Sequence, residues 1–168
     1  APGDLFAVHT GSTTRGFYYG EFSYPEYEDL ATQNQTLQNV GGWVDGDANL
    51  AGTEAPARVL IRLATPSLLP TLGVAPARGR NFLPEEVYKG RDHVALLDHG
   101  LWQRQFNGAA DVVGKSLRLD GVPYQIVGVL PAGFQLEHPV DVWLPLGTSD
   151  DMMKVRNAHF LDVVGRRR

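Results

Sequence analysis

Gly114–Phe134, GKSLRLDGVPYQIVGVLPAGF, predicts a single β-hairpin from which the rest of the chain can be placed. Asp120-Gly121 provides its two-residue turn, because both turn positions must tolerate a positive φ. Counting outward from the turn gives the expected cross-strand pairs, which are Leu119 with Val122, Arg118 with Pro123, and Leu117 with Tyr124. The alternation of hydrophobic and polar residues ends at Gln125, so we expect Ile126–Val129 to be buried on both faces.

The same stretch contains Gly114-Lys115-Ser116, which matches the end of a phosphate-binding loop. That motif requires a glycine five residues earlier, where Ala109 stands, and a helix directly afterwards to meet the phosphate. A strand and a tight turn are expected there instead. We therefore predict no nucleotide site and assign no cofactor.

Length and composition describe an ordinary globular chain. Its 168 residues suffice for one domain or two small subdomains, and its net charge of −4 argues against a nucleic-acid surface. The absence of cysteine excludes disulfides, thiolate metal ligands and a cysteine nucleophile. No apolar run approaches the roughly 18 residues of a membrane helix. The chain begins at Ala1 without a signal peptide, so we expect a piece of a longer protein.

The remaining hydrophobic patterns predict an α+β chain rather than a regular alternation of strand and helix. Strands are expected at Leu5–His9, Gly42–Leu50, Ala57–Leu63, Val94–Leu97, Val140–Leu146 and His159–Val164. Helices are expected at Tyr24–Val40, Pro66–Leu72 and His99–Phe106, with Asp98 as a cap of the last. Polar connections are expected at Gly11–Gly20, Arg78–His93 and Ser149–Asn157.

The first helix has the clearest predicted start. Ser23 and Glu26 form a capping box. Apolar residues recur at helical spacing up to Val40, and Gly41-Gly42 is expected to end the helix. The glycosylation sequon Asn34-Gln35-Thr36 falls inside it, and we interpret it as chance.

Histidines and acidic residues offer two hypotheses for chemistry, and neither forms a motif. The histidines are His9, His93, His99, His138 and His159, and none has the paired spacing of a zinc site. Scattered surface or capping histidines are the preferred interpretation. Glu85, Glu86 and Asp92 form an acidic group suited to general acid–base work, but a solvated loop is the preferred interpretation. We assign no catalytic, cofactor-binding or metal-binding residue.

The three tryptophans could stack on a sugar or a peptide. Trp102 and Trp143 lie in apolar patterns, so we expect both in the core. Trp43 follows Gly41-Gly42, and for it both interpretations, a core residue or a surface for stacking a ligand, stay open.

A succession of short motifs covers nearly the whole chain, from about Leu5 to Val164. In chain order they are Tyr24-Pro25-x-Tyr27-x-Asp29-Leu30, Leu72-Gly73-Val74-x-Pro76-x-x-Gly79-Arg80-x-Phe82, Leu101-Trp102-x-Arg104-x-Phe106, Gly114-Lys115-x-Leu117, Val127-Gly128-Val129-x-Pro131-x-x-Phe134 and Val142-Trp143-x-Pro145-Leu146. Their order resembles the MacB-like periplasmic core domain of FtsX-like ABC transporter permeases, including the acidobacterial permease group.

The resemblance implies a domain inserted between two membrane helices of a permease. Its α+β fold would have a porter-like strand–helix–strand part at 1–63 and 147–168, and an inserted strand-rich lobe at 64–146 containing the hairpin. The family continues beyond His159–Arg168 with a second strand–helix–strand unit, so the porter-like part is expected to be incomplete at its C-terminus. The family often has serine or threonine where Asp98 stands. Gly79 and Phe82 fit the family pattern, and we interpret them as a backbone bend and an apolar anchor.

The resemblance also implies a location and partners. The domain would lie on the extracytoplasmic face of the bacterial inner membrane and be non-catalytic. Its partners would be a second permease copy, an ABC ATPase domain or subunit, a periplasmic adaptor protein, and the membrane through flanking helices; no nucleic acid is expected. The function implied is coupling of ATP-driven helix motion to substrate export or signalling.

Two other functions stay open. One is a free-standing extracytoplasmic binding module for a peptide, lipid or glycan, with a pocket lined by aromatic residues such as Tyr18, Tyr19 or Trp43. The other is a hydrolase that uses Glu85, Glu86 or Asp92.

Overall fold

The computed structural model describes residues 5–8, 23–33, 37–51, 56–88, 90–146 and 161–167, which form an α+β fold, as predicted. They belong to two compact units. Unit 1 takes the described parts of Ala1–Val44, Ala64–Val74 and Thr148–Arg168, and unit 2 takes those of Asp45–Leu63 and Ala75–Gly147. These units divide the chain at other residues than the expected porter-like part and lobe, which stay a prediction.

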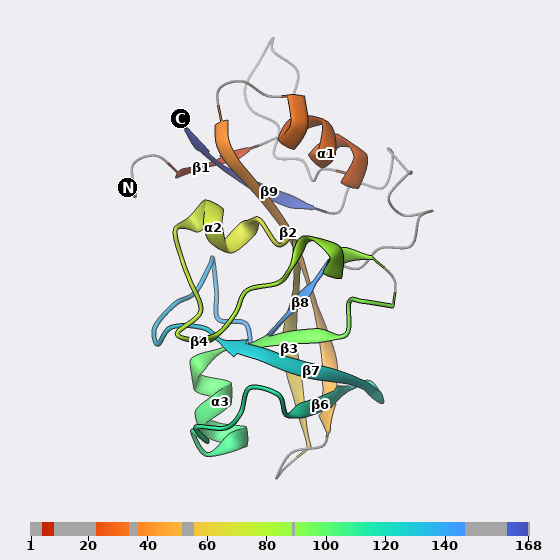
Figure 1. The fold of residues 1–168 in the computed structure, drawn as a ribbon, viewed down its shortest axis with the longest axis vertical. Helices are drawn as coiled ribbons and strands as arrows, with labels where there is room; N and C mark the ends of the chain where they lie inside the picture. Colours follow the sequence, from red (N-terminus) through yellow and green to blue (C-terminus); the bar gives the residue numbers. More distant parts are fainter. Residues whose placement is uncertain are drawn as a thin grey trace. The chain divides into compact units, whose positions relative to one another are not determined.

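Unit 1 is built on three neighbouring strands (Figure 1). Strand β9 (Asp162–Arg167) lies between β1 (Leu5–Val8) and β2 (Leu37–Ala51), and it is antiparallel to both. The helices of this unit are α1 (Tyr24–Gln33) and α2 (Leu68–Leu72). β1 and β9, the first and last strands in the described part of the chain, therefore lie side by side.

A set of close contacts ties the helices of unit 1 to β2. The Tyr27 hydroxyl donates to the carbonyl oxygen of Val40 at 3.2 Å and lies 2.8 Å from the hydroxyl of Ser67. A side chain on Gly41 would place its Cβ 2.5 Å from the Cα of Leu68. The glycine therefore lets the β2 backbone approach α2.

The predicted first helix is right at its start and wrong at its end. Ser23 and Glu26 form the capping box, with backbone-to-side-chain distances of 3.1 and 3.3 Å. The helix ends at Gln33, however, and residues 37–40 belong to β2, so Gly41-Gly42 lies inside a strand instead of ending a helix. The physical reason is tertiary: this part of β2 pairs with β9, so burial beside a distant strand overrides the helical spacing.

Unit 2 contains most of the strands. Starting from the second half of β2, hydrogen-bonded neighbours in the sheet follow in the order β2, β3, β8, β5, β7, β4. Strand β6 pairs with both β2 and β7. Their bounds are β3 Ala57–Ala64, β4 Arg78–Gly79, β5 Val94–Leu97, β6 Ser116–Leu119, β7 Val122–Val129 and β8 Val142–Pro145. A short 3₁₀ helix, η2, spans Pro84–Val87.

The hairpin prediction is confirmed in its turn and its register. Asp120 and Gly121 have φ values of 50° and 82°. The observed pairs are Ser116 with Gln125, Leu117 with Tyr124, Arg118 with Pro123, and Leu119 with Val122. All four residues from Ile126 to Val129 are buried, as expected for a strand covered on both faces. Because a strand follows Ser116, the nucleotide-loop alternative is also removed.

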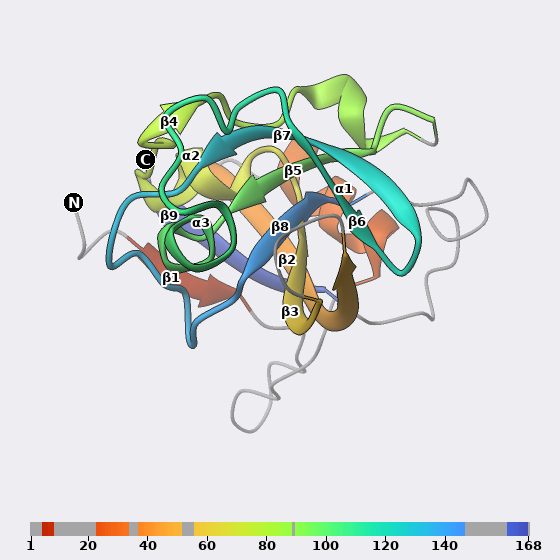
Figure 2. The ribbon, with the colours of Figure 1, turned by 90° about the horizontal axis from the view of Figure 1, so that it is seen from below.

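Helix α3 (His99–Phe106) packs on the strands of unit 2, and Figure 2 looks along its axis. Its predicted cap is confirmed, because the Asp98 carboxylate accepts from the Gly100 N–H at 3.0 Å. Leu101 and Trp102 of α3 join a buried cluster with residues of the surrounding strands. The other members of this core are Ala48, Leu50, Val59, Ala95, Leu97, Val112, Leu117, Leu119, Ile126, Val129, Val142 and Leu144.

The remaining predictions differ in outcome. Helix α2 begins at Leu68, two residues later than predicted, and ends at Leu72 as predicted, followed by Gly73 in a left-handed conformation with a φ of 73°. The last strand, β9, spans Asp162–Arg167, three residues later than predicted at each end. It continues past Val164 because Arg166 pairs with Leu5 of β1 and Arg167 pairs with Leu37 of β2. The expected connections at Gly11–Gly20 and Ser149–Asn157, and the sequon at Asn34-Gln35-Thr36, lie outside the described residues.

Candidate functional site

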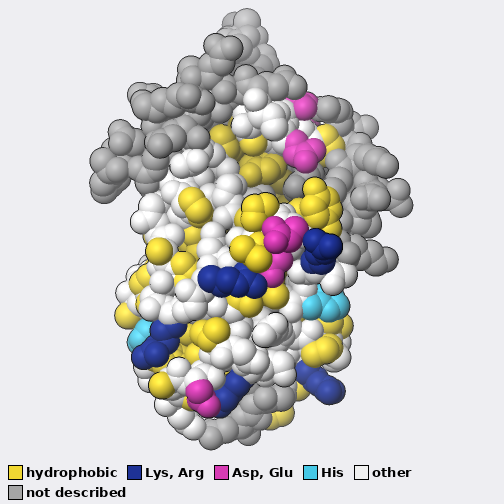
Figure 3. All heavy atoms as spheres, viewed as in Figure 1, with side chains coloured by type: hydrophobic (Ala, Val, Ile, Leu, Met, Phe, Trp, Pro, Cys, Tyr) yellow, Lys and Arg dark blue, Asp and Glu magenta, His cyan; other side chains and the backbone are white. Residues whose placement is uncertain are grey.

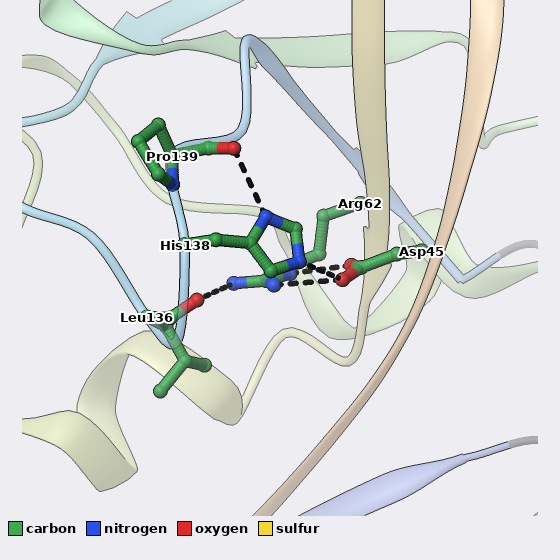
Figure 4. Close-up of polar contacts among 5 residues, drawn as sticks. All are labelled: Asp45, Arg62, Leu136, His138 and Pro139. Carbon is green, nitrogen blue, oxygen red and sulfur yellow. Dashed lines mark hydrogen bonds and ion pairs between the residues drawn. The ribbon is translucent and has the colours of Figure 1, made fainter.

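A polar network in unit 2 joins three segments of the chain around the side chain of Arg62 (Figure 4). Arg62 comes from β3, Asp45 from β2, and Leu136 and His138 from the connection between β7 and β8. The Nε of Arg62 lies 2.6 Å from Asp45 Oδ1, and its Nη2 lies 2.8 Å from Oδ2. Its Nη1 donates to the carbonyl oxygen of Leu136 at 2.8 Å. The guanidinium thus holds one carboxylate in a two-point contact and one backbone carbonyl.

Arg62 is wholly buried, with a side-chain exposure of 0%, while Asp45 keeps 30% of its side chain exposed. The guanidinium carbon lies 5.2 Å from the centre of the Trp143 ring. A buried charge is tolerated only where hydrogen bonds and an opposite charge compensate its lost hydration. The carboxylate, the carbonyl and the aromatic face together provide that compensation.

His138 closes the network on its exposed side. Its Nε2 lies 3.0 Å from Asp45 Oδ2, and its Nδ1 lies 3.1 Å from the carbonyl oxygen of Pro139. Both neighbouring oxygens are acceptors, whereas a neutral imidazole has one N–H. Both contacts are therefore hydrogen bonds at the same time only in the protonated imidazolium.

The environment of Asp45 changes the pKa of its carboxyl group. Partial burial by itself would raise this pKa, but the hydrogen bonds and positive charge of Arg62, followed by His138, outweigh burial and lower it. Asp45 is consequently an ionised structural partner and is unsuited to donate a proton near neutral pH.

Asp45, Glu137 and His138 also bring one possible metal ligand atom each within 4.8 Å of the others. Two carboxylates and an imidazole are a reasonable donor set for zinc. The Arg62 guanidinium already occupies both oxygens of Asp45, however, and its positive charge opposes a cation there. We therefore assign no metal to this group.

The other histidines of the metal hypothesis are dispersed. His93 lies 5.2 Å, ring centre to ring centre, from Tyr124. His99 lies 5.3 Å from Trp102 in an edge-on arrangement. His9 and His159 lie outside the described residues. The three histidines that the structure describes do not share a site.

The acidic residues of the hydrolase hypothesis do not act as a pair. Glu85 is exposed, whereas Glu86 is buried and accepts from Arg80 at 2.9 and 3.1 Å and from the Leu83 N–H at 2.7 Å. The expectation of a solvated loop is thus wrong for Glu86. Burial alone would raise the pKa of Glu86, but the Arg80 and Leu83 contacts outweigh it and lower the pKa. Glu86 fixes the backbone of η2.

The tryptophans are all core residues. Trp102 and Trp143 are 6% and 2% exposed, which confirms the prediction for both, and Trp43 is 4% exposed. Trp43 therefore offers no stacking platform at the surface. Tyr18 and Tyr19, the other aromatic candidates for a binding module, lie outside the described residues.

Gly79 and Phe82 have the structural roles expected of them, a backbone bend and an apolar anchor. Gly79 has a φ of 70°, and a Cβ there would lie 2.0 Å from the carbonyl oxygen of Val127. Phe82 is 4% exposed. The Arg62 network, in contrast, was missed, and its only sequence signal is an arginine inside the apolar run VLIRLA.

The surface drawn in Figure 3 carries no broad patch of one sign among the described residues, because acidic, basic and hydrophobic side chains are interspersed there. No helix in the described part of the chain is long and apolar enough to cross a membrane.

Three solved structures share the fold of this chain. A domain of a protein described as a permease from Porphyromonas gingivalis has a TM-score of 0.76 at 16% identity, covering 98% of this chain and 75% of that chain. The periplasmic region of MacB from Actinobacillus actinomycetemcomitans has a TM-score of 0.69 at 13% identity, covering 97% and 72%. The extracellular domain of the noncanonic ABC-type transporter YknZ from Gram-positive bacteria has a TM-score of 0.67 at 13% identity, covering 98% and 82%. No match to a curated protein is found.

These structures share the fold of this chain. The sequence model of the MacB-like periplasmic core domain matches residues 1–164. The chain therefore belongs to that family and is an extracytoplasmic domain of an ABC transporter permease.

Proposed function

We propose that this chain is a non-catalytic mechanical domain, which couples ATP-driven motion of permease membrane helices to substrate export or to signalling outside the membrane. Its partners would be a second copy of the permease, the ABC ATPase domain or subunit that drives it, and a periplasmic adaptor protein. The division into a porter-like part and a lobe belongs to the same proposal.

One observation carries this proposal: Leu5 of β1 pairs with Arg166 of β9. Because the two strands are antiparallel, the start of the first and the end of the last lie side by side. In a domain inserted between two membrane helices, a pull on the segment before β1 would therefore act directly on β9 and, through β9, on β2.

The Arg62 network supports a route for that movement within the chain. The first segment of unit 2 runs from Asp45 to Leu63. Asp45, on β2, is its first residue, and Arg62, on β3, is its last residue but one. The chain thus passes between the units directly beside both partners of the ion pair. We infer that the ion pair links β2 and β3, so that a force applied to one strand is transmitted to the other.

Distance measurements in the full-length permease with its ATPase test the proposal. A spin label on a cysteine replacing exposed Glu85 would report the separation of the two permease copies. The distance distribution is expected to shift between the nucleotide-free state and the state trapped with ATP and vanadate, and an ATPase that cannot hydrolyse ATP is the control. An unchanged distribution during active hydrolysis would contradict the coupling role.

A further inference from the structure

A groove on unit 2 has no role in the coupling proposed above. It has a volume of about 690 Å³ and lies between α3, β4 and the end of β7. Ala77, Val129, Ala132 and Trp102 provide its apolar lining, and Arg78, His99 and Gln103 provide its polar groups. The volume falls in the range of small-molecule pockets, roughly 300–1,000 Å³.

Arg78 is held in place without being neutralised. Its guanidinium carbon lies 4.8 Å from the centre of the Trp102 ring. Stacking covers a face of the guanidinium and leaves the N–H groups along its edge available to an oxyanion. No acidic side chain among the described residues pairs with Arg78. Basic residues elsewhere in the described chain with an acidic partner within 4 Å are Arg58, Arg62, Arg80, Arg104 and Lys115.

The neighbouring polar groups add donors on the same side. His99 and Gln103 are four residues apart on α3, so their side chains share a face of the helix. His99 lies at the start of α3, where the helix dipole favours negative charge. The nearest acid in sequence, Asp98, accepts from the Gly100 N–H and is not among the residues that line the groove. Groups that favour an anion therefore converge beside an apolar surface.

We propose that this groove binds a small anionic amphiphile, in which a carboxylate or phosphate group is attached to an apolar chain. The oxyanion would accept from Arg78, with His99 and Gln103 beside it, and the apolar chain would lie on Ala77 and Ala132 next to Trp102. The opposing interpretation is that Arg78 only covers Trp102. In that case substitution of Arg78 changes the stability of the chain but changes the affinity for no ligand.

Calorimetric titration of the 168-residue chain tests the proposal with four probes below their micelle concentrations. Decyl phosphate and decanoate carry both features, inorganic phosphate carries only the anion, and decyl maltoside carries only the apolar chain. At least one anionic amphiphile should bind with a dissociation constant on the order of 1 mM or tighter. Inorganic phosphate and decyl maltoside should bind at least about 10-fold more weakly, and the better of the two amphiphiles identifies the headgroup.

Variants assign the binding to the groove. Arg78→Gln should weaken the amphiphile at least about 10-fold, as expected for loss of charged hydrogen bonds. Gln103→Glu, at an exposed position in the groove, should weaken it similarly by adding a negative charge. Arg118→Gln is the matched control, because Arg118 is also exposed and lacks an acidic partner among the described residues. It should leave affinity unchanged.

Four results would overturn the proposal. They are no binding of either amphiphile at several millimolar, equal binding of inorganic phosphate, equal binding of decyl maltoside, or unchanged affinity in Gln103→Glu. The last variant keeps the test valid if Arg78→Gln is unstable. Shifts of the Trp102 indole signal in NMR spectra should accompany binding in the unmodified chain.

Discussion

Arg62 and Asp45 are joined by two hydrogen bonds across the neighbouring strands β3 and β2, at 2.6 and 2.8 Å, with the arginine wholly buried. The same two strands carry a second ion pair, Arg58 with Asp47, at 2.8 Å, and both of its side chains are more than half exposed. The chain thus contains a buried pair and an exposed pair of the same chemistry in the same strand pair.

Asp45→Asn should destabilise the chain by about 2–3 kcal/mol, because a wholly buried guanidinium loses its compensating charge. The figure lies below that for a fully buried pair because Asp45 is partly exposed. The matched control Asp47→Asn should cost less than about 1 kcal/mol, as exposed pairs do. Urea unfolding of both variants measures the difference, and equal losses would contradict the structural role of the Arg62 network.

Glu86→Gln should lower the free energy of unfolding at neutral pH, and this free energy should then fall less steeply as the pH is lowered. The folded chain lowers the pKa of Glu86, so the unfolded chain binds a proton more readily. The stability from this group is fully present above the ordinary carboxyl pKa of about 4.3, and it is lost as the pH falls through the lower folded value. Urea midpoints between about pH 7 and pH 3 provide the measurement.

Glu85→Gln is the control for this experiment, since Glu85 is adjacent in sequence and exposed. It should keep the stability and acid dependence of the unmodified chain. If Glu86→Gln behaved in the same way, the Arg80 contact would have no energetic role.

Gly79→Ala should be more destabilising than Gly90→Ala, although both glycines have a positive φ, 70° and 91°. The left-handed conformation costs a side chain about 1 kcal/mol at either position. At Gly79 the added Cβ would also lie 2.0 Å from the Val127 carbonyl oxygen, whereas nothing lies within 4 Å at Gly90. Thermal unfolding should show an extra loss of roughly 2 kcal/mol or more for Gly79→Ala. Similar losses would mean that β4 can move off β7 at little cost.

Features that depend on neighbouring residues could be predicted from the sequence. The hairpin register follows from Asp120-Gly121 and the alternation around it, and the start of α1 follows from Ser23 and Glu26. Each uses hydrogen bonds between residues a few positions apart.

Features that depend on distant residues could not be predicted. The end of α1 was missed because residues 37–43 are fixed by β9, more than a hundred residues later. Arg62 is buried because its partners, Asp45 and Leu136, lie 17 and 74 residues away. Glu86 is a different case, because its partners Arg80 and Leu83 lie only six and three residues away, and the irregular backbone between β4 and η2 gives no periodic pattern that would pair them. For α1 and Arg62, tertiary contacts overrode a local pattern.

The proposed coupling role requires that the domain lies outside the membrane as part of a permease. The chain has no cysteine, so Glu85→Cys in a full-length parent freed of other cysteines gives one exposed thiol on η2. Spheroplasts of the native cell type would be treated with a maleimide that cannot cross membranes. We expect the parent in the membrane fraction and the introduced thiol labelled to the same extent before and after permeabilisation. A soluble parent, or labelling only after permeabilisation, would contradict this position.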